Sequence, residues 1–289
     1  KQFTVWQPEP SVRADFVGEV RAILRDKSAG IWIGQASTIA HINADGQLLE
    51  HFKSTQHQDS KTLQDSQALV RSLAFDNQGQ LWVGLTGGLR IWRVHQQAAL
   101  AVSLPASLKV PVATVAAILQ DHEQSMWLAM GDDQGLLRWR ADQQSLEKFV
   151  NRPSVNSSLS GDTITSLMQD ASGGLWVGTS DYGANLVDLK GRGFTTYLNI
   201  PGDDRSLSHR LVTAVIPDQA DYVWLGTLGG GLNRLHLPSG DTQRFSKQQV
   251  SVEYIRVLMS DQKKQLWIGG EKLQIFDPKT QRSRDVLVD

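Results

Sequence analysis

The stretch GGLWVGTSDYGANL, residues 173–186, decides the fold, because close variants of it return along the whole chain. The variants are QLWVGLTGGLRIW (80–92), YVWLGTLGGGLNRL (222–235) and QLWIGGEKLQIF (265–276). A glycine-rich binding loop is usually used once, whereas a phrase that recurs at intervals is typical of a repeat architecture. We therefore interpret the phrase as part of the scaffold and look for functional residues around it.

The repeated unit has a fixed core, in which an aliphatic residue, five residues, Asp and five further residues precede Trp. The six copies are Val20, Asp26, Trp32; Val70, Asp76, Trp82; Val115, Asp121, Trp127; Ile164, Asp170, Trp176; Val212, Asp218, Trp224; and Ile255, Asp261, Trp267. Successive Trp residues lie 43 to 50 residues apart, so the variation in length falls in the connections.

Each unit predicts four strands. A first apolar run such as VAAILQ (115–120) ends at Asp and turn-forming residues, and a second run of strand length contains the Trp. Glycines follow, then a third run (for example GLNRLH), and then a fourth that ends near an aromatic residue. The aromatic ends are Phe52, Phe149, Phe194 to Tyr197 and Phe245. Four strands in about 40 to 50 residues indicate a propeller blade. We therefore expect an all-β β-propeller with six four-stranded antiparallel blades, in a single domain over residues 1–289.

The recurring residues have structural interpretations. The Asp side chain can accept backbone N–H bonds in an Asx-turn and so hold the hairpin. Glycine after the second strand permits positive φ in the tight turn to the third strand. A Trp in every blade is expected to fill the space between blades, since a ligand needs one or two such rings. Trp6, Trp92 and Trp139 lie outside the repeat position and are expected to be freer to be exposed.

Composition narrows the classes of function. The chain has 289 residues and no cysteine, which excludes disulfides and thiolate metal sites. Its 29 Lys and Arg residues against 30 Asp and Glu residues leave a net charge of −1, so no broad field attracts nucleic acid or an acidic membrane surface. No apolar run is long enough to span a bilayer. The chain does not begin with Met, and we expect it to be a piece of a longer protein.

The motifs D-x5-W-[VIL]-G-T and GGLNRL, with NSSLSGDTITSL (156–167) and DDRSLSHRLVTAV (203–215), closely resemble two-component regulator propeller repeats. This resemblance covers essentially the whole chain. It implies the periplasmic sensor domain of a membrane-anchored bacterial receptor with a histidine kinase or diguanylate cyclase output. It also implies a small ligand such as an oligosaccharide, and a homodimer in the full-length receptor, while this piece can be monomeric. Blades one, three and six depart from the motif at GQAST, AMGDDQ and GGEKL, so their loops are candidates for binding.

The number of blades and the closing strand stay open. Propellers of this family commonly have seven or more blades, so the six units form either a closed six-bladed ring or part of a seven-bladed or larger tandem propeller. Closure removes open sheet edges. Either FTVWQ (3–7) or SRDVLVD (283–289) can supply the strand that pairs with the last blade.

Binding residues are expected on the long connections between blades and on the turns between strands two and three, which emerge on one face. The long connections are 7–19, 53–68, 151–161 and 199–210. The turns contribute Asp132, Asp133, Asp181 and Tyr182, and the last connection contributes Arg205 and His209. Their carboxylates can accept sugar hydroxyls or hold a cation. The alternative is that they are solvated loop residues.

An arginine pattern points to an acidic ligand. The residue after the first aliphatic position is Arg21, Arg71, Ala116, Thr165, Thr213 and Arg256 in the six units. In a closed ring of six, the sixth, first and second blades are neighbours, and their three arginines form an arc at the mouth of the channel. Such an arc suits bidentate recognition of carboxylate or sulfate. The alternative is that each arginine pairs with a local carboxylate.

No pattern in the sequence indicates catalysis. HExxH, GxSxG and phosphate-loop motifs are absent, and we expect no catalytic residue, cofactor or metal. We place His41, His51 and His236 in strands and His95 and His122 in turns at the far face; only His57 and His209 fall on the upper loops. A protein interaction scaffold and a glycan lyase or hydrolase are the alternatives to a sensor.

Overall fold

The computed structural model describes residues 19–26, 30–43, 47–54, 69–95, 98–153, 155, 158–187, 194–219 and 221–286. These residues form six four-stranded antiparallel sheets, each in the order of the chain, which confirms the all-β propeller. None of the described residues belongs to a helix that is long and apolar enough to cross a membrane. The chain divides into two compact units, residues 1–148 and 149–289. The expectation of a single domain stays a prediction.

Unit 1 contains three blades. Blade 1 consists of β1 (Val20–Arg25), β2 (Ile31–Gln35), β3 (Thr38–Ile42) and β4 (Leu48–Lys53). Blade 2 consists of β5 (Val70–Phe75), β6 (Gln80–Leu85), β7 (Gly88–His95) and β8 (Ala98–Val102). Blade 3 consists of β9 (Val115–Gln120), β10 (Met126–Met130), β11 (Leu136–Arg140) and β12 (Ser145–Phe149), whose last residue passes the boundary.

Unit 2 also contains three blades. Blade 4 consists of β13 (Ile164–Gln169), β14 (Leu175–Thr179), β15 (Ala184–Val187) and β16 (Phe194–Tyr197). Blade 5 consists of β17 (Val212–Pro217), β18 (Tyr222–Thr227), β19 (Gly231–His236) and β20 (Thr242–Arg244). Blade 6 consists of β21 (Val257–Ser260), β22 (Leu266–Gly269), β23 (Leu273–Asp277) and β24 (Arg282–Asp285).

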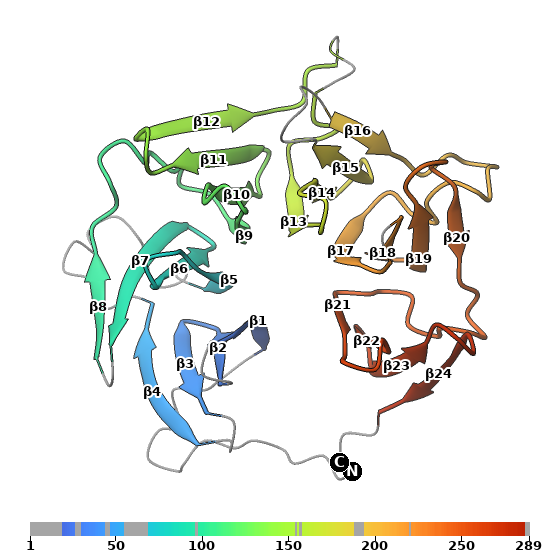
Figure 1. Cartoon of the computed structure of the whole chain (residues 1–289), viewed down its shortest axis with the longest axis horizontal. Helices are drawn as coiled ribbons and strands as arrows, with labels where there is room; N and C mark the ends of the chain where they lie inside the picture. The colour runs from blue at the N-terminus through green and yellow to red at the C-terminus, as the bar shows by residue number, and fades with distance from the viewer. Residues whose placement is uncertain are drawn as a thin grey trace. The chain divides into compact units, whose positions relative to one another are not determined.

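Neighbouring blades of a unit meet along their first strands. In unit 1, β5 contacts both β1 and β9, and in unit 2, β17 contacts both β13 and β21 (Figure 1). The fourth strand of each blade forms the opposite edge of its sheet (Figure 1). The turns between the second and third strands contain the glycines with positive φ that the repeat predicts. Gly135 and Gly183 lie in these turns, and Gly88 and Gly231 are the first residues of β7 and β19.

The core lies between blades, and the middle blade of each unit contributes residues to two clusters. Trp82 of β6 packs in one cluster with Trp139 of β11, and Trp32 of β2 packs in another with Trp92 of β7. Trp92 and Trp139 are each 2% exposed, so the expectation that they are freer to be exposed is wrong. Their third-strand positions face the neighbouring blade's second-strand Trp, and this pairing of faces is not visible in the repeat itself. Trp6 lies outside the described residues.

The repeat tryptophans are core residues as predicted, with one exception. Five of them are at most 4% exposed, namely Trp32, Trp82, Trp127, Trp176 and Trp224. Trp267 is only partly buried. Burial of so large a ring contributes more to stability than burial of any other side chain.

The repeated Asp holds its hairpin and also binds the Trp. In blade 2, Asp76 Oδ1 accepts the backbone N–H groups of Gln78 and Gln80 at 3.0 and 2.8 Å, as expected of an Asx-turn. Its Oδ2 accepts the indole Nε1–H of Trp82 at 2.9 Å. The same indole bond joins Asp121 to Trp127, Asp170 to Trp176 and Asp261 to Trp267. The fixed spacing from Asp to Trp therefore places one carboxylate on both the turn and the ring.

Three further expectations concern single elements. The fourth strand of the last blade is β24, which includes part of SRDVLVD and pairs with β23. The competing FTVWQ lies outside the described residues. His41, His51 and His236 lie in strands as predicted, whereas His95 is the last residue of β7 and not part of a turn.

Candidate functional site

The loop that enters blade 5 (199–210) is closed by its own side chains. Asn199 Nδ2 donates to the carbonyl of Leu207 at 2.5 Å, and Ser206 Oγ accepts the backbone N–H of Ile200 at 2.9 Å. The loop that enters blade 4 repeats these bonds. The corresponding residues there are Asn151, Leu159, Ser158 and Arg152. Much of the recurring Ser-Leu-Ser motif therefore fixes loop shape.

A polar residue on the third strand anchors each loop to its blade. In blade 5, Asn233 Oδ1 accepts the N–H of Ser208 at 2.8 Å, and Asn233 Nδ2 donates to Ser208 Oγ at 2.7 Å. Asn185 binds Ser160 in the same way in blade 4, and Gln274 binds Ser251 in blade 6. These buried amides replace bonds to water that the loop backbone loses on folding.

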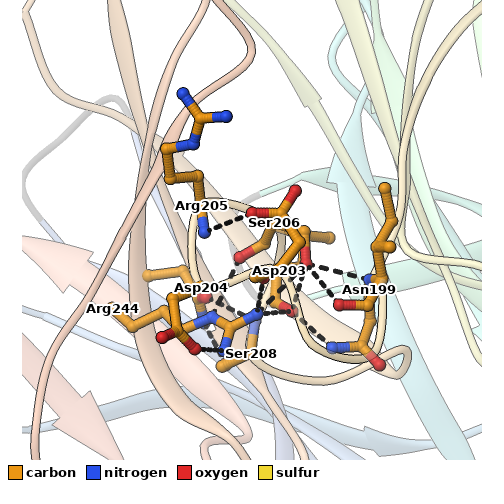
Figure 2. Close-up of polar contacts among 10 residues, drawn as sticks. Asn199, Asp203, Asp204, Arg205, Ser206, Ser208 and Arg244 are labelled. Atoms are coloured by element: carbon orange, nitrogen blue, oxygen red, sulfur yellow. Dashed lines mark hydrogen bonds and ion pairs between the residues drawn. The ribbon is translucent and has the colours of Figure 1, made fainter.

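Arg244 at the end of β20 completes the closure of the blade 5 loop (Figure 2). Its guanidinium group donates to the carbonyls of Asp203, Ser206 and Leu207 at 2.7, 3.0 and 3.1 Å. It also contacts the carboxylate of Asp204 at 3.2 Å. The planar fork of arginine suits several carbonyls at once, so Arg244 is a structural residue and is not available for a ligand.

Arg21 and Arg71 lie on β-bulges. The register between β5 and β6 shifts between Val70 and Ser72, which leaves Arg71 unpaired in the ladder. The register between β1 and β2 shifts in the same way around Arg21. A bulge re-aims the side chain of its extra residue, and bulges are common beside active sites. Arg21 and Arg71, which share a position in the sequence repeat, therefore also share a bulge position in the first strand of their blades.

Arg71 is half-buried and has no close acidic partner among the described residues, where no carboxylate oxygen lies within 4.0 Å of its guanidinium group. Burial lowers the pKa of Arg71, and the positive charge of Arg21 lowers it further, while the charges of Asp132 and Glu19 act in the opposite direction. Arg21 itself pairs with Glu19 at 3.1 Å. Arg21 and Asp132 thus both lie within electrostatic range of Arg71 in unit 1.

Arg256 belongs to unit 2, so the predicted arc of three arginines stays a prediction. The Arg256 side chain is exposed, and its backbone N–H donates to the carbonyl of Gly269 at 2.8 Å. In blades 4 and 5, the same position carries Thr165 and Thr213. Each hydroxyl donates at 2.5 Å to a carbonyl at the start of the next blade.

Asp132 and Asp133 form the exposed turn between β10 and β11. Both have positive φ, 54° and 58°, which is uncommon for a residue with a side chain. Asp132 Oδ2 accepts the backbone N–H of Thr114 at 2.8 Å. The turn is therefore held in shape while Asp132 stays near Arg71.

Asp181 and Tyr182 form the corresponding turn of blade 4 in unit 2. Asp181 accepts a hydrogen bond from Ser180 Oγ at 2.8 Å and lies 3.8 Å from the Nε atom of Arg210. The Tyr182 ring is exposed and packs against Gly161 of the loop that enters the blade. The structure thus brings these two candidates together with Arg210, which the sequence did not single out although it follows His209 in the same loop.

Arg205 and His209 both belong to the blade 5 loop, but they differ in how firmly the structure holds their side chains. The side chain of Arg205 points away from the loop cluster in Figure 2 and is 78% exposed, with Asp241 3.8 Å away. His209 Nδ1 accepts the backbone N–H of Leu211 at 3.2 Å, its ring packs beside Gly229, and its Cβ lies beside Gly230. Of these two candidates, only His209 is held in place.

Side chains suited to metal or acid–base chemistry are not concentrated on the described loops. Among the described residues, no group of three or more His, Asp or Glu side chains is arranged to hold a metal ion. His41 lies in blade 1 between Asp26 at 3.1 Å and Glu50 at 3.7 Å, stacked on Trp32. This cluster takes the place of the Asp-to-indole bond that blades 2, 3, 4 and 6 contain, and so belongs to the scaffold.

Residues 158–181 match the family described as two component regulator propeller, so the resemblance seen in the sequence is confirmed for this repeat. The matched segment contains the Ser-Leu-Ser motif of the blade 4 loop, β13, β14 and the turn residue Asp181. A search of curated proteins finds no relative of the chain.

Several solved propellers share the fold. One is the extracellular domain of a hybrid two component system of B. thetaiotaomicron, with 22% identity, a TM-score of 0.63, and coverage of 74% of this chain and 29% of that one. Virginiamycin B lyase of Staphylococcus aureus has 15% identity, a TM-score of 0.67 and coverage of 93% and 85%. PorZ, a surface component of the type-IX secretion system of Porphyromonas gingivalis, has 18% identity, a TM-score of 0.68 and coverage of 92% and 40%.

These similarities establish the fold and leave function to the site. A propeller can carry a sensor, an enzyme or a secretion component, because function depends on residues placed on the scaffold. The chain spans under a third of the length of the two component system domain that it matches.

Proposed function

We propose that this chain is the ligand-sensing propeller of a membrane-anchored bacterial signalling receptor, that it lies in the periplasm, and that it binds a small acidic ligand without catalysis. The two component regulator propeller repeat at residues 158–181 supports the receptor assignment. The extracellular domain of the hybrid two component system is similar in fold, which is consistent with a location outside the cytoplasm.

One observation carries the ligand assignment, namely the half-buried guanidinium group of Arg71. A buried charge is costly unless it is paired, and among the described residues no carboxylate lies within 4.0 Å of Arg71. Arg21 adds a second positive charge nearby. A carboxylate or sulfate group would supply the missing partner in a bidentate geometry.

Signalling requires that the ligand favour one state of the receptor over another. We propose that ligand binding changes how two chains associate in the full-length receptor. We expect neither nucleic acid nor the membrane surface to bind this domain.

A thermal-shift screen of the purified chain tests this function. The compounds are small organic anions and acidic and neutral oligosaccharides, because a ligand of the folded state raises the melting temperature. We expect a shift from acidic compounds that is lost in Arg71→Ala and kept in Arg93→Ala, which removes an exposed arginine of β7. Shifts that persist in Arg71→Ala, or turnover of any oligosaccharide, would contradict the proposal.

A further inference from the structure

We infer that unit 2 carries a second binding site, centred on Tyr182, for the ring of an acidic sugar. This inference rests on the proposed ligand-binding function, but it concerns different residues from those around Arg71. Tyr182 is 55% exposed, although its backbone is held on both sides. Its N–H donates to Thr179 Oγ1 at 3.1 Å, and its carbonyl accepts a bond from Ser160 Oγ at 2.9 Å.

The ring itself is positioned by a glycine. A Cβ atom built on Gly161 would lie 2.5 Å from Cδ2 of Tyr182 and 3.2 Å from Cε2, so only glycine lets the ring pack this closely. Gly161 does not have positive φ, and its backbone therefore has no need of glycine. The close approach of the Tyr182 ring is the observed reason for a glycine here, and it indicates a ring that is fixed before any ligand binds.

Two opposite charges belong to residues that adjoin Tyr182 in the backbone. Asp181 precedes Tyr182, and the carbonyl of Arg210 accepts the N–H of Gly183, which follows it. The carboxylate of Asp181 and the guanidinium group of Arg210 are 3.8 Å apart, and their side chains are 52% and 68% exposed. A pair so exposed and so loosely joined contributes little to stability. Both groups keep hydrogen-bonding capacity for a ligand that lies on Tyr182.

The loop that enters blade 5 meets this site through its backbone. The N–H of Gly183 donates to the carbonyl of Arg210 at 2.8 Å. Tyr182 precedes Gly183 in the chain, and His209 precedes Arg210. His209 in turn packs on Gly230, where an added Cβ would lie 2.7 Å from the Cβ of His209. In blade 4, Tyr182 of the turn packs on Gly161 of the entering loop. In blade 5, His209 of the entering loop packs on the glycines of the turn.

The chemistry of this site matches a pyranose that bears a carboxylate. The C–H face of a sugar ring packs on an aromatic face, and an aromatic ring fixed in advance loses little entropy on binding. Asp181 can accept hydrogen bonds from sugar hydroxyls, while Arg210 can bind the sugar carboxylate through two parallel bonds. A neutral sugar would lack the bond to Arg210, and a small anion would lack the packing on the Tyr182 ring.

Calorimetric titration of the full chain tests the inference. The probes are the trisaccharides of galacturonate, glucuronate and mannuronate, together with the matching neutral trisaccharides. We expect at least one uronate trisaccharide to bind, and we expect Tyr182→Ala to weaken its affinity about tenfold. Tyr182→Phe, which keeps the ring, is the matched control and should bind like the parent chain.

Two further variants test the position of the Tyr182 ring and the charge of Arg210 separately. Gly161→Ala leaves every polar group in place but displaces the ring, so it should weaken binding in the same way as Tyr182→Ala. Arg210→Gln should weaken binding of the uronate trisaccharide and leave any weak binding of the neutral one unchanged. Circular dichroism and the melting temperature confirm that each variant is folded.

The results distinguish this inference from the proposed function. Loss of trisaccharide binding in Arg71→Ala, with no change in Tyr182→Ala, would show that the sugar binds around Arg71 and would overturn the second site alone. No binding by any uronate trisaccharide would also overturn the inference. The proposed function would still be supported in that case by thermal shifts from small anions that depend on Arg71.

Discussion

The repeated Asp shows how one residue type takes different partners in different blades. Four of these carboxylates accept a Trp indole N–H, but Asp26 contacts His41. Asp218 accepts a hydrogen bond from Arg234 Nε and forms an ion pair with its guanidinium group. Arg234 lies over the rings of Tyr222 and Trp224. The buried indole nitrogen of Trp32, by contrast, has no hydrogen-bond partner among the residues that the structure describes. Asp residues at the same repeat position therefore contribute different amounts to the free energy of unfolding.

Replacement of Trp by Phe should reveal this difference. Trp82 and Trp32 are both almost fully buried, but only Trp82 donates its indole N–H to an Asp. We expect Trp82→Phe to lower the free energy of unfolding by about 1–2 kcal/mol more than Trp32→Phe, because it leaves a carboxylate oxygen of Asp76 without its donor. Urea denaturation measures both values, and equal losses would contradict the role given to the indole bond.

The pH dependence of stability should reflect the turn carboxylate of blade 4. Burial raises the pKa of Asp170, but hydrogen bonds from Ser172, Trp176 and Gly174 outweigh burial and leave the pKa below its ordinary value of 3.8. A lowered folded pKa means that the stabilisation is present above the unfolded pKa and is lost as the pH falls through the folded pKa.

Asp170→Asn should therefore lower the melting temperature at pH 7 and reduce its fall on acidification below about pH 4. Melting temperatures across an acidic pH series measure both effects. Asp142→Asn, which changes an exposed carboxylate, is the control and should leave the series unchanged. An unchanged acid slope in Asp170→Asn would contradict the assignment.

At the scale of elements, loops and bulges decide which side chains are available. The loops that enter blades 4 and 5 are closed by their own Asn and Ser side chains and by a third-strand amide. The bulges on β1 and β5 remove Arg21 and Arg71 from the regular alternation of the strand. A closed loop presents turn residues such as Tyr182 at fixed positions, as a preorganised site requires.

Arg244→Lys tests the closure of the blade 5 loop. A lysine ammonium cannot reach three carbonyls in the way that the guanidinium fork does, so the loop should open more often. We expect hydrogen exchange of the amides of Asp203, Ser206 and Leu207 to become about tenfold faster, since tenfold corresponds to about 1.4 kcal/mol. Amides of β17 should keep their rates. Arg205→Lys, a change in a side chain that points away from the loop, should alter none of them.

At the scale of the whole molecule, six blades are built on one pattern but divide into two compact units of three. A single four-stranded blade cannot bury its apolar faces alone, so each blade depends on its neighbours for stability. In unit 1 the clusters around Trp32 and Trp82 both include residues of blade 2, and in unit 2 the clusters around Trp176 and Trp224 both include residues of blade 5.

We expect the full chain to unfold as one domain. Calorimetry should show a single transition whose measured enthalpy equals the van't Hoff enthalpy, because that equality is the test of cooperative two-state unfolding. Two resolved transitions would show that residues 1–148 and 149–289 are independent domains and would contradict the single-domain prediction.

The amino-acid sequence by itself determined the six repeat units, their strands and the turn that the repeated Asp holds, because strand period, turn residues and Asp-to-Trp spacing are local along the chain. It also indicated positions 21 and 71 and the turn residues Asp181 and Tyr182. Only the tertiary structure decided that Trp92 and Trp139 are buried, that Arg71 lacks a close carboxylate among the described residues, and that Tyr182 packs on Gly161 and lies beside Arg210. These features depend on side chains from separate strands and loops, and a sequence does not specify which of them meet.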